Sequence, residues 1–232
     1  MTLLEIIQEV FAGLGLNKPT AAAQTADTQA LQAVALINDE VLALMRDPVP
    51  WKSLNKEFTI TGVANQTLYP TPTDFGYLID GTQFSRSQHW AIYGPLSPQQ
   101  WQGWKSSSGR PAQAGLRTRL RETGLEFLEQ PGAGSVFVCE YQSAAAVKNG
   151  VTYKKRATED EDTFQFPDAL FLLALKWRWL RAKGLNYEHE YDEYMEQLAS
   201  NRARDNGSTQ LSMLPGANGQ ILINAQNFPE SI

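Results

Sequence analysis

The chain has 232 residues, of which 42% are hydrophobic, which is enough for one large domain or two smaller ones with a buried core. No stretch approaches the roughly 18 to 20 uninterrupted apolar residues that a membrane-spanning helix needs, so a membrane protein is not expected. The net charge of −5 argues against a protein that grips nucleic acid, because such proteins normally carry a basic excess. The negative charge does not exclude a protein that lets DNA pass.

Two further features bear on where the protein works. The first ten residues carry acidic side chains, Glu5 and Glu9, where a secretory signal would have basic ones. This predicts a protein that stays in the cytoplasm or in a particle assembled there. The single cysteine, Cys139, excludes an intrachain disulfide, and its position in a strand-like run predicts that it is buried.

The first fifty residues have the pattern of two amphipathic helices. Thr2 and Glu5 have the spacing of a capping box, in which each side chain accepts a hydrogen bond from the other residue's backbone at a helix start. A second, longer helix can be capped by either Thr25 or Asp27. It is expected to end one or two residues before Pro48, because proline cannot continue a helix.

From residue 51 to about residue 154 the pattern changes to short apolar–polar alternations that are broken by Gly, Pro, Asn and Ser, which is typical of strands and turns. One or two helical turns are expected at 97–105, where Pro98 takes a first helical position. The region is therefore predicted to be a small β domain. The candidate strands are 57–61, 67–69, 77–84, 89–93, 115–121, 125–129 and 135–142.

The most unusual element is a helix expected from Pro167 to Gly184, because it has two apolar stripes. One stripe contains Leu172, Leu175, Trp179 and Ala182, and the other contains Leu170, Leu173, Trp177 and Leu180. A surface helix of a monomer needs only one stripe, so the second is expected to contact a further partner, such as another copy of the chain. The residues expected at this subunit interface are Leu173, Leu175, Trp177, Trp179 and Leu180.

A fourth helix, which Asn186 can cap, follows the turn at Gly184 and forms an antiparallel hairpin with the third. Packing the first two helices against the last two buries all the stripes. The predicted fold class is therefore α+β. It comprises a four-helix bundle from 1–50 and 155–206, an inserted small antiparallel β domain at 51–154, and an extended C-terminal arm at 207–232.

The C-terminal segment spaces isolated apolar side chains with Gly, Asn, Ser and Pro, so it cannot build a core alone. One hypothesis is a floppy terminus, and the other is an arm that lies in a groove of a partner. The apolar run at 220–224 favours the arm, because apolar side chains serve no purpose in a tail that stays in solvent. The residues expected to dock on a partner are Leu211, Met213, Leu214, Ile221, Ile223 and Phe228.

Few side chains have the pattern of a catalytic or ligand-binding site. Neither His89 nor His189 has a second histidine at a metal-ligand spacing, and no glycine-rich phosphate loop is present. We therefore predict no catalytic residue, no cofactor and no metal.

Two groups of residues leave an enzymatic or glycan-binding alternative open. The acidic run 159–162 could supply paired carboxylates for glycoside hydrolysis, although a solvated linker, or a charge patch facing the basic run 154–156, is the favoured interpretation. Trp90, Trp101 and Trp104 could stack on sugars, but core or interface anchors are the favoured interpretation.

Four passages, taken in order, give the chain a resemblance to the head-to-tail adaptor (connector) proteins of tailed bacteriophages, the group that includes tail tubular protein A. Each passage alone is weakly specific, and their order carries the resemblance. The passages are 4–15 with the helix that runs on to 47–54, the Tyr–Pro and Asp–Phe turn at 69–76, the Gly–Pro run at 94–101, and 162–184 with Tyr191 and Tyr194.

The resemblance implies a structural virion protein without enzymatic activity. It implies a ring of twelve subunits beneath the portal vertex, which joins the portal protein to the tail nozzle or tail tube and lets genomic double-stranded DNA pass through its lumen without sequence-specific binding. Assembly would take place in the host cytoplasm. An acidic net charge suits such a channel, because basic walls would hold phosphates. The alternative hypothesis is a virion-associated peptidoglycan hydrolase or glycan-binding module.

Overall fold

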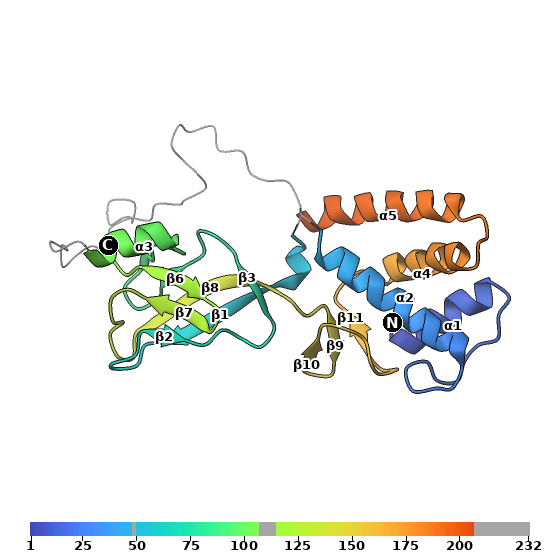
Figure 1. The fold of residues 1–232 in the computed structure, drawn as a ribbon, viewed down its shortest axis with the longest axis horizontal. Helices are drawn as coiled ribbons and strands as arrows, with labels where there is room; N and C mark the ends of the chain where they lie inside the picture. Colours follow the sequence, from blue (N-terminus) through green and yellow to red (C-terminus); the bar gives the residue numbers. More distant parts are fainter. Residues whose placement is uncertain (48–49, 107–114, 207–232) are drawn as a thin grey trace, which may run out of the picture.

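The computed structural model describes residues 1–47, 50–106 and 115–206, which form an elongated molecule with two lobes (Figure 1). The fold is mixed α and β with small antiparallel sheets, which confirms the predicted α+β class. One lobe contains most of the strands and the short helix α3 (Pro98–Ser106). The other lobe contains the helices α1 (Leu3–Gly13), α2 (Thr28–Met45), α4 (Asp168–Ala182) and α5 (Glu188–Asn206).

The two N-terminal helices begin where their capping residues predict. In the capping box of α1, the Glu5 backbone N–H donates to the Thr2 hydroxyl at 3.3 Å, and the Thr2 N–H donates to the Glu5 carboxylate at 2.8 Å. Of the two candidate caps of α2, the structure selects Asp27, which accepts from the Gln29 N–H at 2.9 Å.

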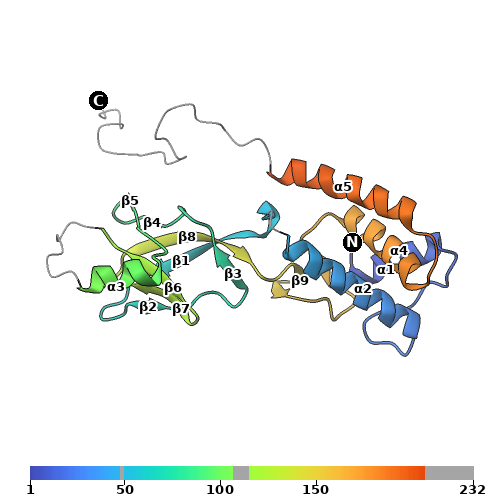
Figure 2. The ribbon, with the colours of Figure 1, turned by 45° about the horizontal axis from the view of Figure 1, so that its top comes forward.

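Helix α4 is the centre of the helical lobe and contacts α1, α2 and α5. Helix α5 lies along the outer edge of this lobe in both views (Figures 1 and 2). The core between the helices is apolar, and its fully buried side chains include Ile6, Phe11, Ile37, Leu170, Phe171 and Leu175.

Two antiparallel sheets build the β lobe around a separate apolar core. The larger sheet has the order β1 (Asn55–Thr61), β8 (Val136–Ser143), β4 (Phe84–Ser85) and β5 (Trp90–Ala91), with β3 (Phe75–Leu78) also paired to β8. The smaller sheet has the order β2 (Leu68–Tyr69), β7 (Gly124–Phe127) and β6 (Thr118–Arg121). The core between them contains Ile60, Tyr69, Ile92, Leu125, Phe127 and Phe137.

Every candidate strand predicted from the alternation overlaps a strand in the structure, and one of them overlaps two. The segment 77–84 is divided between β3 and β4 because a turn with a positive φ at Gly81 interrupts it. Cys139 in β8 is buried, as predicted, and burial together with the negative charge of Glu57 raises the pKa of its thiol to about 12.

A third small sheet was not predicted. It consists of β9 (Val147–Asn149), β10 (Thr152–Lys154) and β11 (Thr163–Phe164), and it lies beside the helices in Figure 1. Four residues inside the range 51–154, which was expected to form the β domain, belong instead to the helical core. They are Ala146 and Val147, and Trp51 and Leu54 at the short helix η1 (Lys52–Leu54). The exact division into domains stays a prediction.

Asp74, in the turn at 69–76, joins the strands β1 and β8 of the larger sheet. Its carboxylate accepts hydrogen bonds from Lys56 in β1 at 2.6 Å, and from the Tyr141 and Ser143 hydroxyls in β8 at 2.9 and 2.8 Å. Burial alone would raise the pKa of Asp74, but these three hydrogen bonds outweigh burial and lower it. The Asp–Phe turn is therefore a structural joint of the β lobe.

Candidate functional site

Helices of the same chain cover both apolar stripes of α4. The Trp179 ring lies 4.9 Å from the ring of Phe11 in α1, and only 4% of this tryptophan is exposed. On the other stripe, the Trp177 ring lies 5.2 Å from Tyr191 and 6.0 Å from Tyr194 in α5, and 5% of Trp177 is exposed. The second stripe therefore has an intramolecular partner, which is the hairpin helix α5.

The five α4 residues expected at a subunit interface are divided by their burial. Leu175, Trp177 and Trp179 are buried within the chain, whereas Leu173 and Leu180 are half-buried. An interface role for this helix stays a prediction, and in the folded chain the two half-buried leucines expose more surface than the other three residues. The residues expected to dock on a partner, Leu211, Met213, Leu214, Ile221, Ile223 and Phe228, lie outside the described residues.

A buried ionic group joins α2, α4 and α5, and the sequence pattern did not reveal it. Glu40 in α2 is fully buried. One of its carboxylate oxygens accepts hydrogen bonds from Nε and Nη2 of Arg178 at 2.9 and 2.6 Å, and the other accepts from the Tyr194 hydroxyl. Burial and the neighbouring Glu40 raise the pKa of Tyr194, so its hydroxyl keeps the proton that it donates.

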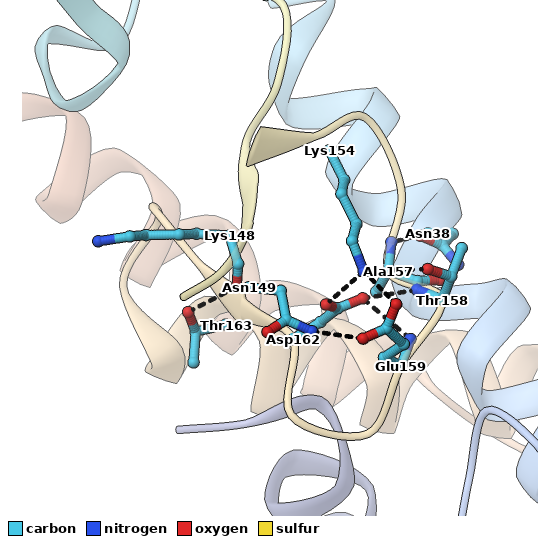
Figure 3. Close-up of polar contacts among 9 residues, drawn as sticks. All are labelled: Asn38, Lys148, Asn149, Lys154, Ala157, Thr158, Glu159, Asp162 and Thr163. Carbon is cyan, nitrogen blue, oxygen red and sulfur yellow. Dashed lines mark hydrogen bonds and ion pairs between the residues drawn. The ribbon is translucent and has the colours of Figure 1, made fainter. Parts of the chain in front are cut away.

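The acidic run at 159–162 ends in a buried carboxylate that organises the turn (Figure 3). Asp162 accepts hydrogen bonds from the backbone N–H groups of Thr158 and Glu159 at 2.7 and 3.0 Å. The Lys154 ammonium reaches into this turn and pairs with Asp162 at 3.1 Å and with Glu159 at 2.8 Å. Of the basic run 154–156, only Lys154 pairs with the acidic run among the described residues, so the expected charge patch is present in part.

The same acidic run fastens the loop between α1 and α2. The Asp160 carboxylate accepts from the backbone N–H groups of Ala22 and Ala23 at 3.0 and 2.7 Å, and Asn38 of α2 is bonded in both directions to the backbone of Ala157. Three of the four acidic residues thus hold the fold together. A hydrolytic mechanism would need two of them free to flank a sugar.

We predict that Asp162→Asn makes the chain about 2 kcal/mol less stable at pH 7, because the amide cannot accept from all three donors and loses the charged pair. Burial alone would raise the pKa of Asp162, but its hydrogen bonds from the backbone and from Lys154 lower it. A lowered pKa contributes stability above the unfolded-chain value of about 4, and this contribution is lost as the pH falls further. The deficit of the variant should therefore shrink below about pH 4. Urea unfolding at pH 7 and pH 3 measures it.

The control for this experiment is Glu161→Gln, which changes the one exposed acid of the run that has no ion pair or side-chain hydrogen bond among the described residues. Its stability should equal that of the unchanged chain at both pH values. An equal loss in both variants, or a deficit of Asp162→Asn that does not depend on pH, would contradict the assigned role.

The tryptophans of the β lobe serve mainly as anchors. Trp101 is buried under the Arg119 guanidinium, 4.2 Å from its ring centre, and Arg117 lies 3.7 Å from the ring centre of Trp104. These stacked cations favour the interpretation as core and interface anchors. Trp90 differs, because 47% of it is exposed at the edge strand β5.

Metal-binding clusters and membrane-spanning helices are both absent from the described part of the chain. Residues 1–47, 50–106 and 115–206 contain no group of three or more His, Cys, Asp or Glu side chains placed to hold a metal ion. Within the same ranges, no helix has the length and apolar character needed to cross a membrane.

Comparison with protein families places the chain in a class of viral structural proteins. A family model matches residues 1–218, which cover both lobes, and it identifies a bacteriophage adaptor protein. The model is described as SU10 adaptor protein, and the chain belongs to this family. No match was found among curated proteins. The resemblance to phage adaptors is thereby confirmed, whereas the closer likeness to tail tubular protein A stays a prediction.

Proposed function

We propose that this chain is the head-to-tail adaptor of a tailed bacteriophage, which joins the portal to the tail nozzle or tail tube. The observation that carries the proposal is the adaptor-family match over residues 1–218. In this function twelve copies form a ring, as in adaptors like tail tubular protein A, and the genome passes through the lumen during ejection. The ring assembles in the host cytoplasm and remains in the virion.

The shape and charge of the protomer support this function. Two lobes with separate cores lie at opposite ends of an elongated molecule, so one end can contact the portal while the other contacts the tail (Figure 2). A net charge of −5 suits a lumen that releases DNA, because a basic wall would bind phosphates. The four long helices then act as one bundle, whose half-buried Leu173 and Leu180 remain available to a neighbouring subunit.

The C-terminal arm is the segment that we assign to portal docking. We predict that a chain truncated after Asn206 keeps its thermal unfolding midpoint but no longer attaches to portal rings, because its docking side chains are gone. Co-sedimentation with purified portal rings and negative-stain electron microscopy measure the attachment. The matched control is a full-length chain in which the arm keeps its length but Leu211, Leu214, Ile221, Ile223 and Phe228 are replaced by serine.

If the apolar side chains provide the docking, this control should fail to attach in the same way as the truncated chain. Normal attachment of the truncated chain would contradict the arm's role. Attachment of the serine variant alone would show that the backbone of the arm, and not its apolar side chains, makes the contact.

A further inference from the structure

A groove of about 550 Å³ lies between α4 and the start of α5. It is lined by Trp177, Arg181, Tyr187, Glu188, Tyr191 and Asp192. The indole N–H of Trp177 is buried in the folded chain and has no hydrogen-bond acceptor among the described residues. The aromatic side chains and the two carboxylates of this groove suit a partner that brings both apolar and basic groups.

Acidic side chains without counter-ions continue from this groove along α5. Glu188, Asp192, Glu193 and Glu196 are exposed, and none of them forms an ion pair within the described part of the chain. Glu190 differs, because it pairs with Lys176 at 3.4 Å. Carboxylates spaced four residues apart on a helix repel each other, so this face costs the free protomer stability that a basic partner would restore.

The hairpin formed by β9 and β10 has the complementary character. Val151 at its tip is 91% exposed, and Lys148, Lys155 and Arg156 are exposed without an ion pair among residues 1–47, 50–106 and 115–206. Figure 3 shows that the Lys148 side chain extends away from the acidic turn, whereas Lys154 reaches into it. Lys154 therefore holds the fold. Lys148, whose ammonium lies 6.0 Å from the Tyr153 ring centre, and Lys155 and Arg156, which directly follow β10, are exposed and can contact another molecule.

The two surfaces lie on opposite sides of the protomer. In Figure 1 α5 follows the upper edge of the helical lobe, whereas β9 and β10 lie below α2 and α4. They cannot meet within one chain. Complementary surfaces on opposite sides are what a head-to-tail contact between identical subunits requires, because such a contact repeats around a ring.

The C-terminal arm is a poorer occupant of the acidic groove, because residues 207–232 contain neither lysine nor arginine.

We propose that the β9–β10 hairpin of one subunit docks on the α5 face of its neighbour. Val151 enters the aromatic groove, and Lys148, Lys155 and Arg156 pair with the free carboxylates of α5. Arg181 at the groove stays beside Trp177, 6.0 Å from its ring centre. This assignment rests on the proposed ring and names the surfaces that close it.

Charge reversal tests the contact. One variant carries Lys155→Glu and Arg156→Glu, a second carries Glu193→Lys and Glu196→Lys, and a third combines all four changes. Each two-residue variant should raise the concentration needed for ring formation about tenfold or more, because like charges then face each other across the contact. The combined variant should restore assembly. Mass photometry over a concentration series, with and without portal rings, measures this.

The control is Asp80→Lys with Glu122→Lys, which changes the net charge as much as the α5 variant but acts on exposed acids of the β lobe. It should assemble normally. Normal assembly of both reversed variants, or failure of the combined variant, would overturn the contact. Portal attachment of the unchanged chain is scored separately, so the head-to-tail function can stand while the contact fails. If the unchanged chain forms no ring even with portal, the proposed ring and the contact both fail.

A cross-link provides a second readout that does not depend on charge. Protein with Val151→Cys is mixed with protein carrying Asp192→Cys and then oxidised. The native Cys139 is only 2% exposed and does not compete. A covalent dimer that forms from the mixture, and from neither protein alone, supports the contact, and the absence of that dimer in assembled rings overturns it.

Discussion

Replacing Glu40 with alanine is expected to lower the free energy of unfolding by about 3–5 kcal/mol, which is the cost of leaving a buried ionic partner uncompensated. Glu40 is fully buried between α2, α4 and α5, and it accepts from both Arg178 and Tyr194. Without it, the Arg178 guanidinium and the Tyr194 hydroxyl lose their common acceptor. Chemical denaturation at pH 7 measures the change.

The neighbouring residue offers a matched control. Asp39→Ala removes a carboxylate from the same helix, but Asp39 is exposed, so its loss should change stability by no more than about 0.5 kcal/mol. Similar losses in both variants would show that the effect comes from α2 itself and not from the buried group. A loss below about 1 kcal/mol in Glu40→Ala would contradict the structural role assigned to this ion pair.

The helices could be predicted because their signals are local. The capping box at Thr2, the cap at Asp27 and the long apolar periods lie within single elements, and the structure confirms them. The small sheet of β9, β10 and β11 escaped prediction because its strands are two or three residues long. Such strands are too short for an alternation to stand out from a loop.

Interactions between distant residues account for what the sequence could not reveal. Glu40 and Arg178 are 138 positions apart, and Asp160 fastens a loop that lies 137 positions earlier, so no local pattern marks these pairs. The two expected stripes of α4 contain its buried Trp177 and Trp179 but omit the buried Phe171, and a pattern does not name the partner that covers a stripe. Here α1 covers Trp179 and α5 covers Trp177.

Whether a helix of the same chain or a neighbouring subunit covers an α4 stripe can be tested at Trp179. Trp179→Ala should destabilise the isolated chain by about 3–5 kcal/mol, because it removes a large side chain that packs on Phe11 in the helical core and leaves a cavity. Thermal and urea unfolding of the dilute, monomeric chain measure the loss. Trp90→Ala is the control, because this tryptophan is 47% exposed and its removal should cost less than about 1 kcal/mol. If Trp179 instead served a neighbouring subunit, the monomer would keep its stability and only ring formation would suffer.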